Sequence, residues 1–516
     1  MIRFSRVRRS TARTQTSAHA AGLVSLIALL ACSSDDGGSD TNDVSRSADM
    51  PAQTTNPANP STNDTPANTE TPAVGTTPTN EGPSAEVPLS TTPGNSEPGP
   101  PTVQPPTVQA PLETPPVLPA PGAFVENSGA ACQIPALAGF NQLPPLASLP
   151  DPFLSLSGTR ISSKAEWTCR RAEISAQIQQ YELGPKPAKP TTVTGAFANN
   201  QLTVSAAEGG RSVSFSVDIT RPANAAAGPI PLLITVGGSG LANVFTSRGV
   251  ATMNFDNDAM GAQGGTNTRG QGVFYNLYGN THEAGSMIAW AWGVSRIIDA
   301  LEATPAANID PKRIAVSGCS RNGKGALVIG AFDERVRLTV PQESGAGGSA
   351  SWRISQVQHD SLPAATRDDP NLTTQTVSTA QGEQPWFRAN FGQFSTTNVT
   401  KLPHDHHELM GMVAPRPLFV IDNTDMNWLG NESSFTDSVA AAELWQGLGV
   451  QGTMGASQVG GHAHCNGVPQ AQLDELGRFV DKFLIGTGTG DTNVLRSDRI
   501  QPDRARWITW STPALQ

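Results

Sequence analysis

The stretch AVSGCSRNGKGAL, residues 315–327, carries an apolar run that meets a helical pattern at Ser320. Its order resembles the nucleophile elbow G-x-S-x-G, in which a strand turns sharply into a helix. Gly318 precedes the serine by two residues, whereas the second glycine, Gly323, comes one place late and an arginine follows the serine. Because such a turn exposes the hydroxyl beside the free N–H groups of the helix, we predict that Ser320 is a nucleophile.

Two alternatives to a nucleophilic Ser320 stay open on this stretch alone. The serine could simply cap the helix, as serine often does at a helix N-terminus. Cys319 could be the nucleophile instead, because side chains alternate across the turn and only one of the two residues forms its exposed apex. Gly318, two residues ahead of Ser320, favours the serine over the cysteine.

Outward from this turn, apolar strand patterns alternate with helical patterns. Predicted strands cover residues 211–222, 229–238, 249–258, 312–318, 335–342 and 415–423, and predicted helices cover residues 284–303, 320–332, 438–450 and 474–486. This alternation predicts an α/β fold in which a mostly parallel sheet has helices on both faces. Ligands of such sheets gather at the carboxyl ends of the strands, where Ser320 lies.

A serine nucleophile needs a general base, and the base needs an acid that orients it. The glycine-rich loop VGGHAHCNG, residues 459–467, precedes the last predicted helix and offers His462 and His464. Two acids follow predicted strands, Glu343 after the first strand beyond the nucleophile and Asp425 after the next. The second place is the commoner one for the acid, but both residues can reach the histidine, so position alone leaves the choice open.

The first part of the 516-residue chain does not belong to this fold. Residues 1–31 combine a basic segment with a short apolar run, as in a signal peptide. The run ends in LLAC, which resembles a bacterial lipobox and implies lipidation of Cys32; an ordinary signal peptide is the alternative. Residues 32–127 are rich in Pro, Thr, Asn and Ser, which predicts a disordered tether, and residues 128–516 remain as one domain.

These features predict the localisation of the protein and exclude one class of binding partner. The residues after Cys32 favour an exported bacterial lipoprotein at the outer membrane or cell surface, whose only membrane contact is the lipid anchor; secretion is the alternative. The net charge of −10 argues against a nucleic-acid partner. We take a monomer as the default.

Four further cysteines, an even number, predict disulfides rather than a metal site because no pair has CxxC spacing; they are Cys132, Cys169, Cys319 and Cys465.

A set of segments along the domain resembles the glucuronoyl esterases, carbohydrate esterase family 15. The segments are GCSRNGKGAL, VPQESGAGGSASWRIS, EQPWF, LPHDHHELMGMVAPRPL, NTDMNWL and GGHAHC. The resemblance begins near Cys132 and implies an α/β-hydrolase fold, a three-layer αβα sandwich. It also implies a serine esterase that cleaves the ester between (4-O-methyl-)glucuronic acid of glucuronoxylan and lignin alcohols, without metal or cofactor.

The resemblance assigns a role to individual positions. It implies that Ser320 is the nucleophile, Glu343 the acid and His464 the general base. Arg321 matches a residue whose backbone N–H and guanidinium form an oxyanion hole. Asp425 lies near the place where some bacterial members hold a second acid, and it could share the work of Glu343. The positions that match the uronate-binding pocket are Lys324, Gln375, Glu383 and Trp428.

The resemblance also implies how the cysteines pair. Cys319 would bond to Cys465, which ties the nucleophile turn to the histidine loop. Cys132 would bond to Cys169 and hold the start of the domain. Both bonds join positions that are far apart in the sequence.

A third disulfide of fungal members is missing here at both ends. Its positions correspond to Ser351 and Asp437, which suggests a bacterial-type member. The run HDHH contains Asp405, His406 and His407, which match a family motif. We assign these three residues structural support rather than a catalytic role.

Two other functions compete with a glucuronoyl esterase. The first is an acetyl or feruloyl xylan esterase on the same fold, which would not explain a lysine, a glutamate and a tryptophan that grip the acid side of the ester. The second is a surface lipoprotein that binds plant cell-wall glycan without catalysis. The complete set of nucleophile, acid, base and Arg321 argues against the second.

Overall fold

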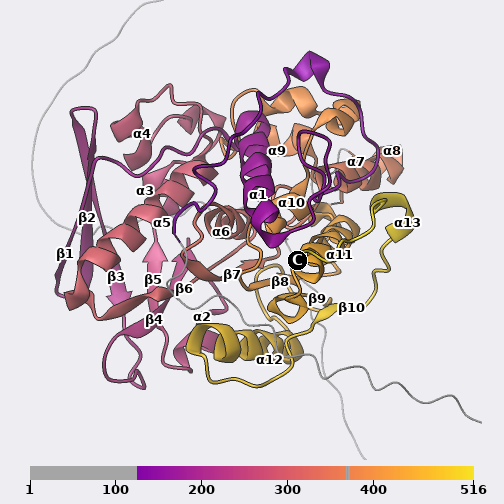
Figure 1. Cartoon of the computed structure of the whole chain (residues 1–516). Helices are drawn as coiled ribbons and strands as arrows, with labels where there is room; N and C mark the ends of the chain where they lie inside the picture. The colour runs from indigo at the N-terminus through magenta and orange to yellow at the C-terminus, as the bar shows by residue number, and fades with distance from the viewer. Residues whose placement is uncertain (1–124, 368, 370–371) are drawn as a thin grey trace, which may run out of the picture. The chain divides into compact units, whose positions relative to one another are not determined.

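The structure is a computed structural model that describes residues 125–516, apart from residues 368 and 370–371. The predicted signal peptide, Cys32 and residues 32–124 of the predicted tether lie outside the described residues. Ten strands of the described part form one sheet with the order β1-β2-β3-β5-β4-β6-β7-β8-β9-β10 (Figure 1). The strands are β1 (Thr192–Ala198), β2 (Gln201–Glu208), β3 (Arg211–Thr220), β4 (Ile230–Val236), β5 (Ala251–Phe255), β6 (Ile309–Cys319), β7 (Val336–Gln342), β8 (Leu418–Asp422), β9 (Met454–Gln458) and β10 (Leu495–Ser497).

Seven neighbouring strands of this sheet, from β5 to β10, run parallel. The strands β1, β2 and β3 add an antiparallel edge, and β3 pairs antiparallel with β5. Every residue of β4, β7, β8 and β9 is buried, as expected for parallel strands covered on both faces. The mostly parallel sheet that the alternating pattern predicts is confirmed.

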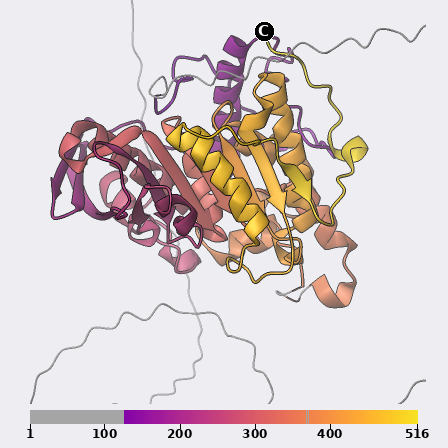
Figure 2. The same cartoon turned by 90° about the horizontal axis from the view of Figure 1, so that it is seen from below.

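Helices cover both faces of the sheet, so the domain has three layers. The helices α5, α6, α10 and α11 lie on one face, and α2 and α12 lie on the other (Figures 1 and 2). The α-helices of the described residues are α1 (Lys164–Ile178), α2 (Ala242–Thr246), α3 (Asn257–Met260), α4 (Val273–Tyr278), α5 (Ser286–Ala303), α6 (Arg321–Phe332), α7 (Trp352–Ser361), α8 (Ala364–Arg367), α9 (Val377–Glu383), α10 (His406–Gly411), α11 (Asn431–Gly447), α12 (Gln470–Phe479) and α13 (Arg504–Trp507).

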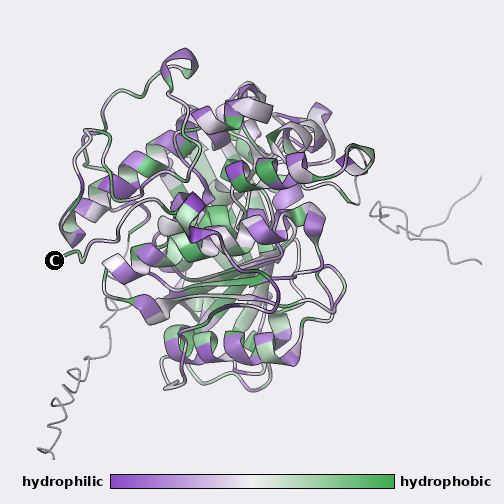
Figure 3. Cartoon of the chain, turned by 90° about the vertical axis from the view of Figure 1, so that its right-hand side faces the viewer, coloured by the Kyte–Doolittle hydropathy of each residue, from purple (hydrophilic) through white to green (hydrophobic). Residues whose placement is uncertain are grey.

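The apolar core fills the space between the sheet and its helices. Figure 3 shows hydrophobic residues on the central strands and hydrophilic residues on the outer sides of the helices. The helix α5 is buried nearly all around because it lies among α6, β1 and β6, and its Trp290 and Trp292 are fully covered. None of the helices within the described ranges combines the length and apolarity that a bilayer span requires.

Candidate active site

Ser320 occupies a sharp turn between β6 and α6. Its backbone has φ +60° and ψ −129°, a conformation that residues with a Cβ rarely adopt. The serine side chain makes no capping bond to the helix, although Ser320 is the N-cap residue of α6. Strained backbone of this kind concentrates at functional sites. The geometry therefore matches an elbow that presents a hydroxyl and differs from an ordinary serine cap.

Two glycines make this turn sterically allowed. A Cβ on Gly318 would lie 2.5 Å from the backbone oxygen of Asn322, and a Cβ on Gly323 would lie 2.6 Å from the backbone oxygen of Gln342. Both contacts are with backbone atoms, which cannot turn aside. Gly323 stands one place later than in G-x-S-x-G because it is the glycine at which α6 crosses the end of β7.

His464 is bound to Glu343, the residue directly after β7. His464 Nδ1 lies 2.8 Å from Glu343 Oε2, and the backbone N–H of Cys465 donates to the same oxygen at 3.1 Å. Glu343 is fully buried and has φ +43°, a second strained position within the site. His464 Nε2 is also buried, and none of the described residues hydrogen-bonds to it. The imidazole is thus oriented at Nδ1 and has Nε2 available for another proton partner.

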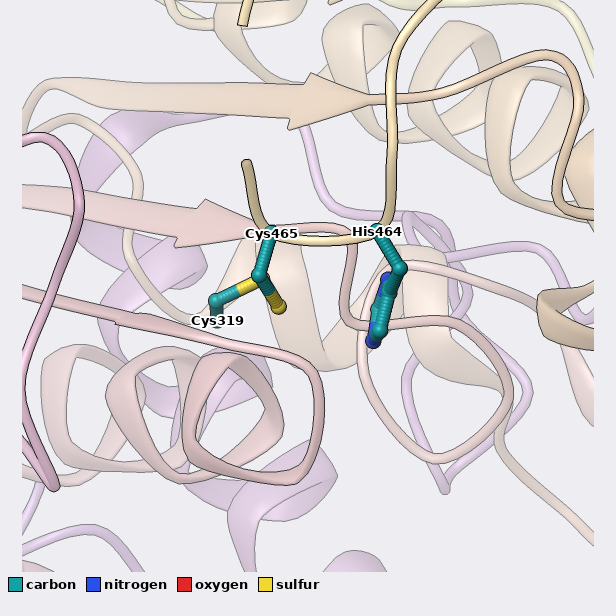
Figure 4. Close-up of side chains that lie close together, drawn as sticks. All are labelled: Cys319, His464 and Cys465. Atoms are coloured by element: carbon teal, nitrogen blue, oxygen red, sulfur yellow. A yellow bond between two sulfur atoms is a disulfide. The ribbon is translucent and has the colours of Figure 1, made fainter. Parts of the chain in front are cut away.

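A disulfide joins the loop of His464 to the turn of Ser320. Cys319 and Cys465 are bonded, and Cys132 and Cys169 form a second bond, so both predicted pairings are confirmed. Figure 4 shows the imidazole of His464 beside the Cys319–Cys465 bond. The two sulfur atoms and a ring nitrogen of His464 lie within 4.8 Å of one another. Since both thiols are consumed in the disulfide, this group offers no thiolate to a metal.

The four predicted uronate-binding residues form one connected group next to this site. Lys324 Nζ lies 3.2 Å from Gln375 Oε1, and Gln375 Nε2 donates to the Glu383 carboxylate at 3.1 Å. The backbone N–H of Gln375 donates to the carbonyl of Trp428 at 2.8 Å, and the Trp428 ring contacts the His464 ring. Lys324 and Gln375 are buried, whereas Glu383 is exposed. The group therefore runs from a buried cation to the surface beside the histidine.

Burial changes the charge balance of two groups in this site. Burial is the main cause that lowers the pKa of Lys324 to about 8, against the attraction of Glu383. Burial likewise raises the pKa of Asp422, the last residue of β8, to about 7, although the hydroxyls of Ser434 and Ser349 donate to its carboxylate. Asp422 was missed by the sequence reasoning. The signal was present, because Asp422 closes the apolar run of the predicted strand.

Asp425 and His462, two candidates from the sequence, do not form the pair of acid and base but hold the loop of His464. Asp425 accepts the backbone N–H of Gly461 at 2.6 Å and pairs with Arg499, and no hydrogen bond of the described residues joins it to His464. The Gly461 bond is the main cause that lowers the pKa of Asp425. Both ring nitrogens of His462 face carbonyl oxygens of its own loop. Asp425 and His462 thus hold the loop, whereas Glu343 contacts His464 directly.

Arg321 begins α6 directly after Ser320. Its guanidinium is exposed, and no acceptor from the described ranges bonds to it. The neighbouring Asn322 accepts a bond from Asn257 and packs against Gly237, where a Cβ would lie 2.3 Å from its amide nitrogen. This contact holds the first turn of α6, with its free N–H groups, against the loop after β4.

The HDHH run lies in the buried core. The Asp405 carboxylate binds the guanidinium of Arg353, and His406 Nε2 lies 2.9 Å from Glu182. His407 Nε2 lies 2.9 Å from the carbonyl of Pro150. These contacts join α10 to α7 and to the segment before α1, in agreement with the structural support assigned to the run.

The positions of the missing third disulfide carry other contacts. Ser351 caps α7 and donates to Asp405 at 2.9 Å. Asp437 is fully buried in α11, 3.6 Å from His407 Nδ1. Burial raises the pKa of Asp437 well above its usual range.

Sequence comparison finds that the chain is similar to a group of fungal enzymes. A family description, "Glucuronyl esterase, fungi", matches residues 204–449. A 4-O-methyl-glucuronoyl methylesterase of Hypocrea jecorina is 48% identical over 387 residues, which are 75% of this chain and 80% of that protein. A protein of the same name from Podospora anserina is 45% identical over 393 residues, which are 75% of this chain and 78% of that protein.

These relatives overturn the predicted localisation. The expectation of an exported bacterial lipoprotein at the outer membrane is wrong, because the relatives are fungal. The same finding speaks against a bacterial-type member. The lipobox inference depended on one cysteine after an apolar run, and any secretory leader can contain that combination.

Solved structures agree with the sequence relatives. The glucuronoyl esterase catalytic domain from Hypocrea jecorina has a TM-score of 0.68 at 47% identity and covers 74% of this chain and 100% of that chain. A mutant of the glucuronoyl esterase from Sporotrichum thermophile, solved with methyl 4-O-methyl-β-D-glucopyranuronate, has a TM-score of 0.68 at 41% identity, with 75% of this chain and 100% of that chain covered. The α/β-hydrolase-type fold is thereby shown, and the chain belongs to the glucuronoyl esterase family.

Proposed function

We propose that this protein hydrolyses the ester between glucuronic acid, with or without a 4-O-methyl group, and an alcohol, as in the links between glucuronoxylan and lignin. The proposal depends on one observation above all. The connected group of Lys324, Gln375 and Glu383 continues through Trp428 to His464, so polar groups suited to a sugar acid adjoin the oriented base. Polar side chains with an aromatic face are typical of sites that hold one sugar in a fixed orientation.

In the proposed reaction Ser320 is the nucleophile and His464 the general base, with Glu343 as the acid that orients it. His464 Nε2 takes the proton of the Ser320 hydroxyl, and Oγ attacks the uronoyl carbonyl carbon. The tetrahedral oxyanion is stabilised by Arg321 and by the free N–H groups at the start of α6. The alcohol then leaves with the proton from His464.

Water completes the proposed cycle. His464 removes a proton from the water, which attacks the uronoyl-enzyme ester. The bond between Ser320 Oγ and the uronoyl carbon breaks, and Oγ recovers the proton from His464. Glucuronic acid is released and the enzyme returns to its starting state.

Hydrolysis of benzyl glucuronate tests this proposal directly. We expect the intact protein to release benzyl alcohol, and we expect Ser320→Ala to lose the activity while keeping its melting temperature. Acetylated xylan serves as the control substrate. Acetate release without cleavage of benzyl glucuronate would favour the acetyl xylan esterase alternative. Inactivity on both substrates would favour the glycan-binding protein instead.

The remaining parts of the proposal concern the whole chain. We take residues 1–31 as a secretory leader, residues 32–127 as a tether and residues 128–516 as the catalytic domain of a secreted, monomeric enzyme. The composition of the tether supports its role as a spacer between the domain and whatever precedes it. Size-exclusion chromatography with light scattering tests the monomer, and N-terminal sequencing of the secreted protein tests the leader.

A further inference from the structure

A cavity of about 290 Å³, lined mainly by polar and charged residues, lies between the loops that flank α4 and the segment after α9. We call it the Arg269 cavity. Its lining includes Arg269, His282, Glu283, Arg388 and Asn390. The volume is just below the range in which proteins hold small ligands, which begins at about 300 Å³. The cavity shares no residue with the proposed catalytic group.

The charges in this cavity leave one cation without a counterion. The carboxylate of Glu283 lies 2.7 Å from Arg388, so the anion of the lining is already paired. The guanidinium of Arg269 is partly buried, and no hydrogen bond or ion pair connects it to any residue that the structure describes. Burial lowers the pKa of Arg269, but arginine keeps its charge at neutral pH. A half-buried, unpartnered guanidinium in a hollow is arranged to receive an anion.

The histidine of the cavity adds a neutral donor. The backbone N–H of Ala284 donates to His282 Nδ1 at 3.2 Å, so the proton of the neutral ring is on Nε2. Burial is the main cause that lowers the pKa of His282, against the attraction of Glu283. The exposed amide of Asn390 adds a further hydrogen-bonding group to the lining.

The segment that contributes Arg388 to the Arg269 cavity follows Glu383 of the uronate-binding group closely in the chain. The backbone N–H of Gly265 donates to the side chain of Gln384 at 2.6 Å, and Gln384 directly follows Glu383. The chain then runs from Glu383 past Trp386, whose ring lies 5.9 Å from Lys324 Nζ, to Arg388 at the cavity. Five residues span at most about 18 Å, so the two sites are separated by no more than a few sugar units.

We propose that the Arg269 cavity binds a free carboxylate of a second uronic acid on the same polysaccharide chain as the ester that is cleaved. This inference rests on the proposed function, because it requires a substrate that carries more than one uronic acid. The uronate whose ester is cleaved has no charge on its carboxyl group, and it binds to the residues around Lys324. A neighbouring uronate with a free carboxyl group is an anion, and the unpaired guanidinium of Arg269 is the cation that binds it.

The test compares two polymeric substrates made from the same glucuronoxylan. In one, all uronates are methyl esters; in the other, part of them are free acids. We expect Arg269→Gln to raise KM about fivefold on the partly esterified polymer, a modest value for a charge-assisted contact at a half-exposed site. On the fully esterified polymer, and on benzyl glucuronate, the variant should equal the unmodified enzyme. The fivefold difference should shrink with added salt.

Two variants control for general effects of charge and shape. Arg269→Lys keeps the positive charge and should keep part of the preference for free acids. Lys312→Gln removes one exposed charge at the far end of β6 from Ser320 and should change neither KM. Equal KM values for Arg269→Gln and the unmodified enzyme on the partly esterified polymer would overturn the inference. So would an equal rise on both polymers, which would indicate binding of neutral sugar. Failure of the unmodified enzyme on benzyl glucuronate would instead overturn the proposed function.

Discussion

The ring of Trp428 meets the imidazole of His464 edge-on, with ring centroids 4.9 Å apart and planes inclined by 73°. The carbonyl of Trp428 also accepts the backbone N–H of Gln375. One residue therefore touches both the proposed general base and the proposed uronate pocket.

We expect Trp428→Ala to raise KM and lower kcat on benzyl glucuronate, with a combined loss of about tenfold or more in kcat/KM. The reason is that an aromatic pair of this geometry contributes roughly 0.5–1.5 kcal/mol, and contact with the sugar is lost as well. Trp428→Phe keeps a ring edge and should recover most of the activity. Steady-state kinetics of both variants would contradict this account if neither constant changed for Trp428→Ala.

Glu343→Gln is expected to lower kcat by about three orders of magnitude, with little change in KM. The amide no longer stabilises the imidazolium that forms on His464, and it can orient the ring in the wrong tautomer. The measurement is kcat on benzyl glucuronate beside the melting temperature, which excludes unfolding as the cause.

Asp425→Asn is the matched control for the choice of acid. Asp425 bonds to Gly461 and Arg499 rather than to His464, so its loss should reduce kcat less than tenfold, as expected for a residue that only positions the loop. An equal loss for both variants would mean that the two carboxylates share the role.

Removing the Cys319–Cys465 bond by Cys319→Ala with Cys465→Ala should lower kcat about tenfold to a hundredfold. The bond joins the nucleophile turn to the base loop, and small displacements of reacting groups have large effects on rate. Removing the Cys132–Cys169 bond in the same way is the control. That change should cost about 2–5 kcal/mol in the free energy of unfolding and leave kcat unaffected. Kinetics and chemical denaturation of both double variants separate the two effects.

Lys324 predicts a pH dependence of substrate binding. Because its pKa is lowered to about 8, Lys324 is a cation below that pH and neutral above it. KM for benzyl glucuronate should therefore rise above pH 8 in the unmodified enzyme. In Lys324→Met, KM should be higher and should not change across this range. Lys401→Met, which replaces a lysine packed over Phe140, should show the unmodified profile.

Asp422 predicts a pH dependence of stability. Its pKa is raised to about 7 in the folded protein, whereas the pKa of an aspartate in an unfolded chain is about 4. The folded state therefore binds the extra proton between these values, and the contribution of Asp422 to stability falls as pH rises from about 4 to about 7. Asp422→Asn keeps an acceptor for Ser434 and removes this slope.

Thermal unfolding measures the effect. We expect Asp422→Asn to raise the melting temperature at neutral pH more than at mildly acidic pH. Asp474→Asn, which changes an exposed residue of α12, should not raise the melting temperature at either pH. A larger gain for Asp422→Asn in acid would refute the account.

The sequence predicted the elements whose side-chain period matches their burial. The strand β6, the helix α6 and the buried helix α5 all lie where apolar periodicity places them. The strand β9 was missed because its buried residues include the polar Ser457 and Gln458, which interrupt the apolar pattern; the Gln458 side chain donates to the carbonyl of Asn431. The helix α11 begins at Asn431, ahead of the predicted start, because its polar first turns are buried against α7 and β8.

The sequence by itself determined the fold class and the turn of Ser320, because both depend on the local order of glycine, apolar and polar residues. It left two histidines and two acids open. The tertiary structure decided that Glu343 rather than Asp425 contacts a histidine, and that His464 rather than His462 leaves a ring nitrogen free. Glu343 and His464 are more than a hundred residues apart in the sequence, and the order of the strands and the Cys319–Cys465 bond bring them together. Local periodicity cannot predict such a contact, because it depends only on neighbouring residues.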